Sequence, residues 1–162
     1  MDLLDLDIRL IFAILNGKVS AAINRKLNQN FHSSGFDLTP EKWTVLLYLG
    51  EQDGVTQQHL CTATFKDKPS MTRLIDVMEK QGIVKRMPNK LDRRTNQVYI
   101  TKLGREVRER AQVVAIRTLK EALSGLGINE LRISQEVLRK VFSNTTVHDE
   151  TLLQKPKNRN LR

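Results

Sequence analysis

The spacing of apolar residues changes abruptly near Gly82 in this chain of 162 residues. Ahead of that glycine, apolar side chains recur at steps of three and four, as in a helix with one buried face: Met71, Leu74, Ile75 and Met78. Beyond it, residues 83–87 and 97–101 read as two strands, with Val98 and Ile100 on one face. The sequence therefore predicts a mainly α fold with a small β-hairpin near the middle of the chain.

Capping residues predict two further helices just ahead of the helix that contains Met71 to Met78. Thr39 is a suitable N-cap for a helix that residues 50–54 close, and Thr56 is suited to cap a short helix over residues 57–64. Asp67 is a plausible cap for the helix described above. A short helix, a tight turn and a second helix form the helix-turn-helix plan, whose second helix enters the DNA major groove.

Long amphipathic helices are predicted at both ends of the chain. Residues 2 to about 30 carry an apolar stripe, and residues 102–124 and 128–143 read as two more helices. A stripe this rich needs a partner, either the C-terminal helices of the same chain or a second subunit. We interpret the chain as a helical dimerisation region, a winged helix-turn-helix lobe and a basic tail, over residues 1–35 with 102–143, residues 36–101 and residues 144–162.

The charge balance favours a polyanionic partner. Lys plus Arg number 27 against 18 for Asp plus Glu, which gives a formal net charge of +9. DNA, RNA or an acidic membrane would suit that charge, and so would solubility alone. No apolar run approaches the roughly 18 residues of a membrane span, and the first residues are acidic where a signal peptide is basic. A cytoplasmic protein without membrane contact is expected.

The first turns of the helix after Asp67 hold the candidate base-reading side chains. The predicted contacts are Lys68, Pro69, Ser70, Thr72 and Arg73. An arginine can donate two hydrogen bonds to a guanine edge, and Ser and Thr can serve several bases. A helix face that merely meets solvent would fit this segment equally well.

The hairpin loop favours the DNA-binding interpretation over a merely solvent-exposed helix face, because it carries several cations. Lys90, Arg93 and Arg94 are suited to follow phosphates or to insert into a narrow minor groove. DNA would repel Asp92 unless it were paired, so we expect Asp92 to bind a nearby arginine and stiffen the loop. A helix-turn-helix followed at once by a cationic hairpin describes a winged helix.

The stretch from Leu38 to Gly104 resembles the MarR family of bacterial regulators. The resemblance is carried by Leu38-Thr39, Trp43, Leu46, Met71 to Ile75, Met78 to Val84, Asp92 to Thr95, and Ile100 to Gly104. It implies a homodimer held by the terminal helices, a recognition helix in each major groove, Arg94 at the minor groove and Asp92 steadying the wing. It also implies a repressor that is released by a small molecule or an oxidant.

A switching site is harder to assign from the residues. In the family, small ligands tend to lie between the DNA-binding lobe and the dimer helices, where Phe12, Trp43 and Tyr48 are candidates. Plain core positions are the alternative for all three. The single cysteine, Cys61, is expected to be a buried inert thiol rather than a redox sensor.

No cofactor or metal is expected, because His32, His59 and His148 are scattered and lack ligand spacing. An enzyme is not expected either, since the chain has no glycine-rich phosphate loop and no nucleophile motif. The leading hypothesis is a regulator that binds a near-palindromic double-stranded operator as a dimer. Two alternatives stay open: an architectural DNA-binding protein, and a winged helix that docks RNA or protein.

Overall fold

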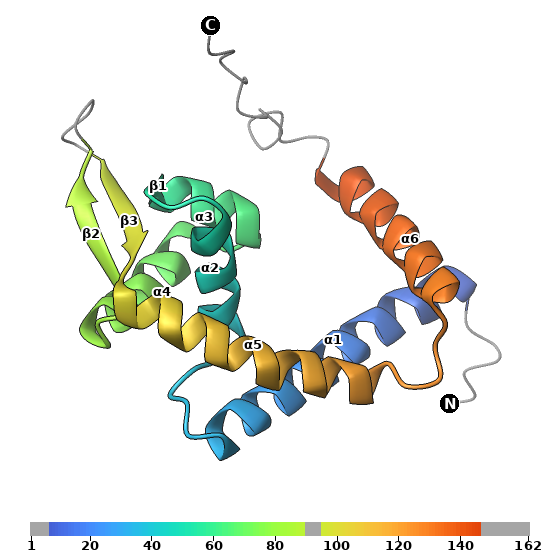
Figure 1. Cartoon of the computed structure of the whole chain (residues 1–162). Coiled ribbons are helices and arrows are strands. Elements are labelled where there is room, and N and C mark those ends of the chain that lie inside the picture. The colour runs from blue at the N-terminus through green and yellow to red at the C-terminus, as the bar shows by residue number, and fades with distance from the viewer. Residues whose placement is uncertain (1–6, 90–94, 147–162) are drawn as a thin grey trace, which may run out of the picture. The chain divides into compact units, whose positions relative to one another are not determined.

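The computed structural model describes residues 7–89 and 95–146. These residues divide into two compact units between Ala122 and Leu123, and each unit is considered by itself. The elements in chain order are α1 (Ile8–Ser33), α2 (Pro40–Glu51), β1 (Val55–Thr56), α3 (Gln57–Thr64), α4 (Lys68–Lys80), β2 (Val84–Pro88), β3 (Asn96–Ile100), α5 (Lys102–Ala122) and α6 (Ile128–Thr146) (Figure 1).

The predicted helix starts at the centre of the chain are confirmed by the capping contacts. Thr39, Thr56 and Asp67 are the N-caps of α2, α3 and α4, and each side-chain oxygen accepts a hydrogen bond from a backbone N–H of the first turn. Gly82, with φ at +71°, follows the end of α4 as a C-cap glycine. The Ile83 N–H then donates to the Met78 carbonyl over 3.1 Å, which turns the chain into β2.

The hairpin is confirmed, and it belongs to a sheet of three strands in the order β1-β3-β2. Both strand pairs are antiparallel, with Val84 opposite Ile100 and Val55 opposite Val98. Strand β1 was not predicted, because two residues are too few to show an alternating pattern. Strand β1 directly precedes α3 and pairs with β3, so the sheet links the helix-turn-helix to the wing.

One hydrophobic core fills the lobe formed by α2, α3, α4 and the sheet. The side chains of Leu46, Met71, Ile75, Met78 and Val98 are each 0% exposed. The predicted apolar face of α4 is therefore confirmed, with Leu74 packed against the edge of the core.

Helices α1 and α5 pack against each other beside this lobe (Figure 1). Asn30 donates to the Thr118 hydroxyl over 2.7 Å at that contact, where Thr118 is fully buried. The predicted stripe of α1 is covered only toward its C-terminal end, at Leu27. Leu15 and Val19 stay about half exposed, at 50% and 53%, because nothing in this unit reaches them.

Helix α6, considered by itself, exposes most of its large apolar side chains. The exposed residues are Ile128, Ile133, Val137, Leu138, Val141 and Phe142. Within the part of the chain that the structure describes, no helix is long and apolar enough to cross a membrane.

Candidate nucleic-acid interface

The N-terminal turn of α4 is fixed by its cap. The Asp67 carboxylate accepts a hydrogen bond from the Ser70 N–H over 2.8 Å. That bond holds the pKa of the Asp67 carboxyl below its ordinary value, and the positive charge of Arg73 adds to the effect. The first turn of α4 is thus held in a single orientation, with Pro69 suited to its start.

The outer face of this turn presents cations to solvent. Lys68, Pro69 and Arg73 are exposed, whereas Met71 and Ile75 on the opposite face are fully buried. No ion pair between described residues involves Lys68 or Arg73. Both side chains are therefore available to an anionic partner.

The two hydroxyl residues predicted to contact bases are less accessible. Ser70 and Thr72 are half-buried. The Thr72 hydroxyl donates its proton to the Lys68 carbonyl over 2.9 Å and accepts a hydrogen bond from the Gln57 amide. Since its single proton is used inside the helix, Thr72 has mainly its methyl group and one lone pair to offer a base.

The wing strands come together just before the loop. The Asn89 N–H donates to the Thr95 carbonyl over 2.9 Å. The predicted wing contacts Lys90, Arg93 and Arg94, with the predicted stabilising residue Asp92, lie outside the described residues.

Sequence reasoning missed a charged network between the wing and α4. Arg86 on β2 forms ion pairs with Asp76 over 2.7 Å and with Glu79 over 2.8 Å. A weak signal was present, because Asp76 and Glu79 are three residues apart and so lie on one face of α4. Only the fold shows which cation they meet.

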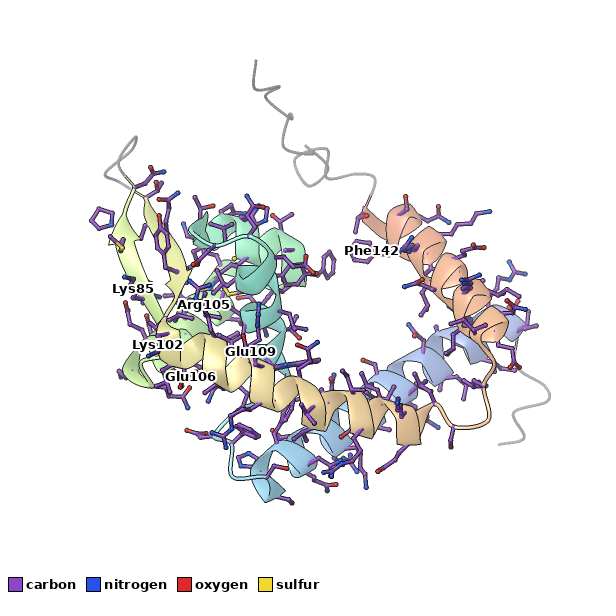
Figure 2. All side chains as sticks on the ribbon, viewed as in Figure 1. Lys85, Lys102, Arg105, Glu106, Glu109 and Phe142 are labelled. Atoms are coloured by element: carbon purple, nitrogen blue, oxygen red, sulfur yellow. The ribbon has the colours of Figure 1, made fainter. Side chains whose placement is uncertain are left out.

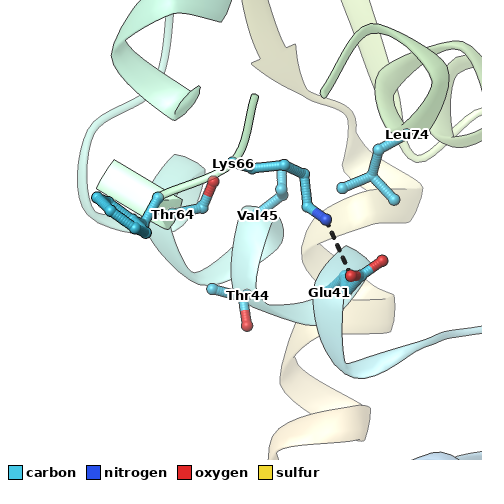
Figure 3. Close-up of a pocket in the computed structure, with 7 residues that line it drawn as sticks. Glu41, Thr44, Val45, Thr64, Lys66 and Leu74 are labelled. Atoms are coloured by element: carbon cyan, nitrogen blue, oxygen red, sulfur yellow. Dashed lines mark hydrogen bonds and ion pairs between the residues drawn. The ribbon is translucent and has the colours of Figure 1, made fainter. Parts of the chain in front are cut away.

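The turn between α3 and α4 is anchored to α2. Lys66, one of the cations of this turn, forms an ion pair with Glu41 over 2.9 Å (Figure 3). The pair lines a small cavity of about 160 Å³ together with Thr44, Val45 and Leu74. Lys66 is therefore occupied within the lobe, unlike Lys68.

Charged side chains also follow α5 from its first turn. Figure 2 labels Lys85 on β2, and Lys102, Arg105, Glu106 and Glu109 along α5. Arg105 pairs with Asp53 over 2.9 Å, and Asp53 also accepts a hydrogen bond from the Ile100 N–H over 2.9 Å. These contacts tie the start of α5 to the sheet, so the lobe and α5 form a connected unit.

A larger cavity of about 350 Å³ lies between the α1–α2 loop, the end of α4 and the first turns of α5. Its lining includes the apolar side chains of Leu38, Ile83, Leu103 and Val107. Leu103 is 48% exposed where it borders this cavity. The guanidinium of Arg110 lies 5.3 Å from the ring centre of another lining residue, Phe36.

The three predicted effector residues do not line either of these cavities. The Trp43 ring lies 5.9 Å from that of Phe31, and its Nε1 is buried without a partner among the described residues. Phe12 and Tyr48 are each 38% exposed, so the plain-core alternative is wrong for both within one chain. Their part in an effector site stays a prediction.

Cys61 is 6% exposed on the inner face of α3, which confirms the predicted buried thiol. Burial raises the pKa of the Cys61 thiol above its ordinary value, and the nearby Asp67 carboxylate raises it further. His32 and His59 are exposed, while His148 lies outside the described residues. No cluster of three or more potential metal ligands occurs among residues 7–89 and 95–146.

Comparison with known proteins agrees with this geometry. Residues 36–95 match the model of the MarR family. The HTH-type transcriptional repressor IacR of Pseudomonas putida is 26% identical over 126 residues, which cover 76% of this chain and 75% of the relative. The transcriptional regulator HosA of Escherichia coli is 25% identical over 107 residues, covering 66% and 79%.

Solved structures extend the match beyond the lobe. A mutant of MarR from Escherichia coli, complexed with operator DNA, superimposes with a TM-score of 0.76 at 27% identity. The superposition covers 87% of this chain and 99% of that one. The segment that matches the MarR family model contains α2, the helix-turn-helix and β2, and the chain is similar to MarR structures over most of its length.

Proposed function

We propose that this protein is a sequence-specific regulator of transcription that binds double-stranded DNA. The single observation that carries the proposal is the division of α4 into two faces. Met71 and Ile75 are fully buried, while Lys68 and Arg73 are exposed and unpaired among the described residues. A helix so divided can enter the major groove, with Arg73 reading a base edge and Lys68 contacting phosphate.

The wing completes the proposed interface. In this proposal Lys90, Arg93 and Arg94 follow the backbone or the minor groove beside the site of α4. Asp92 steadies the loop that holds them. The complex of a MarR mutant with operator DNA, whose fold this chain shares, supports the arrangement.

The proposed active form is a homodimer. The half-exposed Leu15 and Val19 on α1, and the apolar side chains of α6, form faces that a second chain would cover. A two-fold dimer would place two recognition helices about 34 Å apart, which requires a near-palindromic operator. Such a regulator works in the cytoplasm, where bacterial DNA lies.

Repression relieved by a small molecule is the proposed mode of action. The cavity of about 350 Å³ is lined by Ile83, in the turn between α4 and β2, and by Leu103 and Val107 on α5. A ligand there would touch the turn that follows the reading helix and a helix of the proposed dimer region, so it could bias their arrangement. The name of the relative IacR, a transcriptional repressor, supports repression.

Fluorescence anisotropy of Arg73→Ala against the unaltered protein tests the base-reading role. Both would be titrated with a duplex that the unaltered protein selects from a random pool, and with a scrambled duplex. We expect Arg73→Ala to cost about 1–3 kcal/mol on the selected duplex and to accept other bases at one position. An equal loss on both duplexes would exclude base reading by Arg73.

A further inference from the structure

Arg86 lies on a strand of the wing but directs its charge inward. Its side chain is only 19% exposed. One guanidinium nitrogen, Nη2, lies 2.7 Å from Oδ1 of Asp76, and the other, Nη1, lies 2.8 Å from Oε2 of Glu79. The same Nη2 lies 3.4 Å from the Thr72 carbonyl oxygen. All of these oxygens belong to α4.

Glu79 holds the backbone of the wing as well. Strand β2 is an edge strand of the sheet, so every second N–H of β2 points away from β3. The N–H of Arg86 donates to Oε1 of Glu79 over 2.8 Å. One carboxylate therefore receives both a guanidinium and a backbone N–H of the same residue, which is a strong charge-assisted arrangement.

Helix α3 joins the same network through Gln57. The Gln57 side chain donates to the Thr72 hydroxyl, and its carbonyl oxygen lies 3.4 Å from Nη2 of Arg86. Thr72, Asp76 and Glu79 follow one another at steps of four and three, so they form one stripe along α4. The stripe connects both helices of the helix-turn-helix to the wing.

We propose that Asp76, Glu79 and Arg86 form a clamp that sets the position of the wing relative to α4. Arg86 is then a positioning residue and not a phosphate contact, although it is a wing cation. Two carboxylates face one guanidinium, so the cluster carries a net negative charge and repels a phosphate. The inference rests on the proposed function, because it concerns how two DNA-reading elements are held in register.

Glu79→Ala separates the two roles of Arg86, with Glu106→Ala as the matched control. Glu106 is exposed on α5 (Figure 2), and its loss changes the net charge by the same amount. If Arg86 positions the wing, Glu79→Ala weakens binding to the selected duplex by about 3- to 30-fold and does not weaken binding to scrambled DNA. Glu106→Ala leaves the preference unchanged. Tighter binding of Glu79→Ala to both duplexes, beyond that of the control, would mean that Arg86 had been freed to bind phosphate, which overturns the proposal.

Arg86→Lys gives an independent check. A lysine ammonium binds phosphate well but cannot bridge two carboxylates as a planar guanidinium does. The clamp therefore predicts that Arg86→Lys loses preference nearly as far as Glu79→Ala. Full retention of the preference would contradict the clamp.

Amide hydrogen exchange in the DNA-free protein distinguishes failure of the clamp from failure of the proposed function. The Arg86 amide is expected to exchange at least about tenfold faster in Glu79→Ala, because it loses a charged acceptor. The amides of Ile75 and Met78 report whether α4 stays folded, and they should not change. An unchanged Arg86 amide refutes the clamp even if the protein selects an operator. A protein without any sequence preference refutes the proposed function, and with it the role of the clamp in DNA reading.

Discussion

The winged-helix lobe and the helices around it differ in how far their large apolar side chains are exposed. In the lobe, Leu46 and Ile75 are 0% exposed, whereas Val113 on α5 is 70% exposed and Ile133 on α6 is 62% exposed. The lobe therefore completes its core within one chain. The flanking helices bury Leu27 and Ala111 but leave many of their large apolar side chains exposed, as expected of surfaces that meet a second subunit.

The largest expected effect comes from opening the core of the lobe. Ile75→Ala removes a fully buried side chain and should lower the free energy of unfolding by about 2–5 kcal/mol. Urea denaturation followed by circular dichroism measures it. Ile133→Ala, at an exposed position, should cost less than about 1 kcal/mol in dilute protein. Equal costs would mean that the two regions do not differ as described.

The next effect comes from placing charge on the uncovered face of α1. Leu15→Glu with Val19→Glu puts carboxylates on two neighbouring turns that are about half exposed. Sedimentation equilibrium should show the dimer becoming a monomer. The affinity for the selected duplex should fall by about 100-fold or more, because two linked contacts become one. Val77→Glu, at an exposed position on α4, should leave the mass unchanged. A dimer that survives the double substitution would place the interface elsewhere.

The smallest expected effect is the change of stability with pH that the buried thiol of Cys61 causes. Burial raises the pKa of the Cys61 thiol, so the folded protein favours the neutral thiol. A pKa that is higher in the folded state gives stability that is complete below the unfolded value of about 9.0 and is lost as pH rises through the folded value. Unfolding midpoints should therefore fall at alkaline pH, and Cys61→Ala should fall less steeply.

Thiol labelling compares the two regions directly. At neutral pH an aromatic disulfide reagent should modify Cys61 only after unfolding. A cysteine placed by Ile133→Cys should react at once in dilute protein and more slowly as concentration favours the dimer. Rapid labelling of Cys61 in the folded protein would contradict a closed lobe.

The local features of the fold could be predicted from the sequence. Thr39, Thr56 and Asp67 cap the expected helices, and the alternation at Val98 and Ile100 marks the buried face of a strand. Such signals depend on residues a few positions apart. Helix boundaries were less exact, since α1 ends at Ser33 rather than near residue 30.

The contacts that organise the candidate site could not be predicted in the same way. Arg86 meets Glu79 only because Gly82 reverses the chain between them, and a cation on a wing strand otherwise suggests DNA contact. Thr72 was predicted to read bases, but its hydroxyl accepts a hydrogen bond from the side chain of Gln57, which lies on another helix. Strand β1 is too short to be recognised until its partner β3 is in place.

Binding of the protein to a selected near-palindromic duplex, compared with a scrambled duplex at several salt concentrations, tests the central claim most directly. Fluorescence anisotropy should show a preference of about a thousandfold or more, with affinity that falls steeply as salt increases. Stoichiometric titration should give two chains per duplex. Equal affinity for both duplexes, or one chain at saturation, would contradict a dimeric regulator that reads sequence through α4.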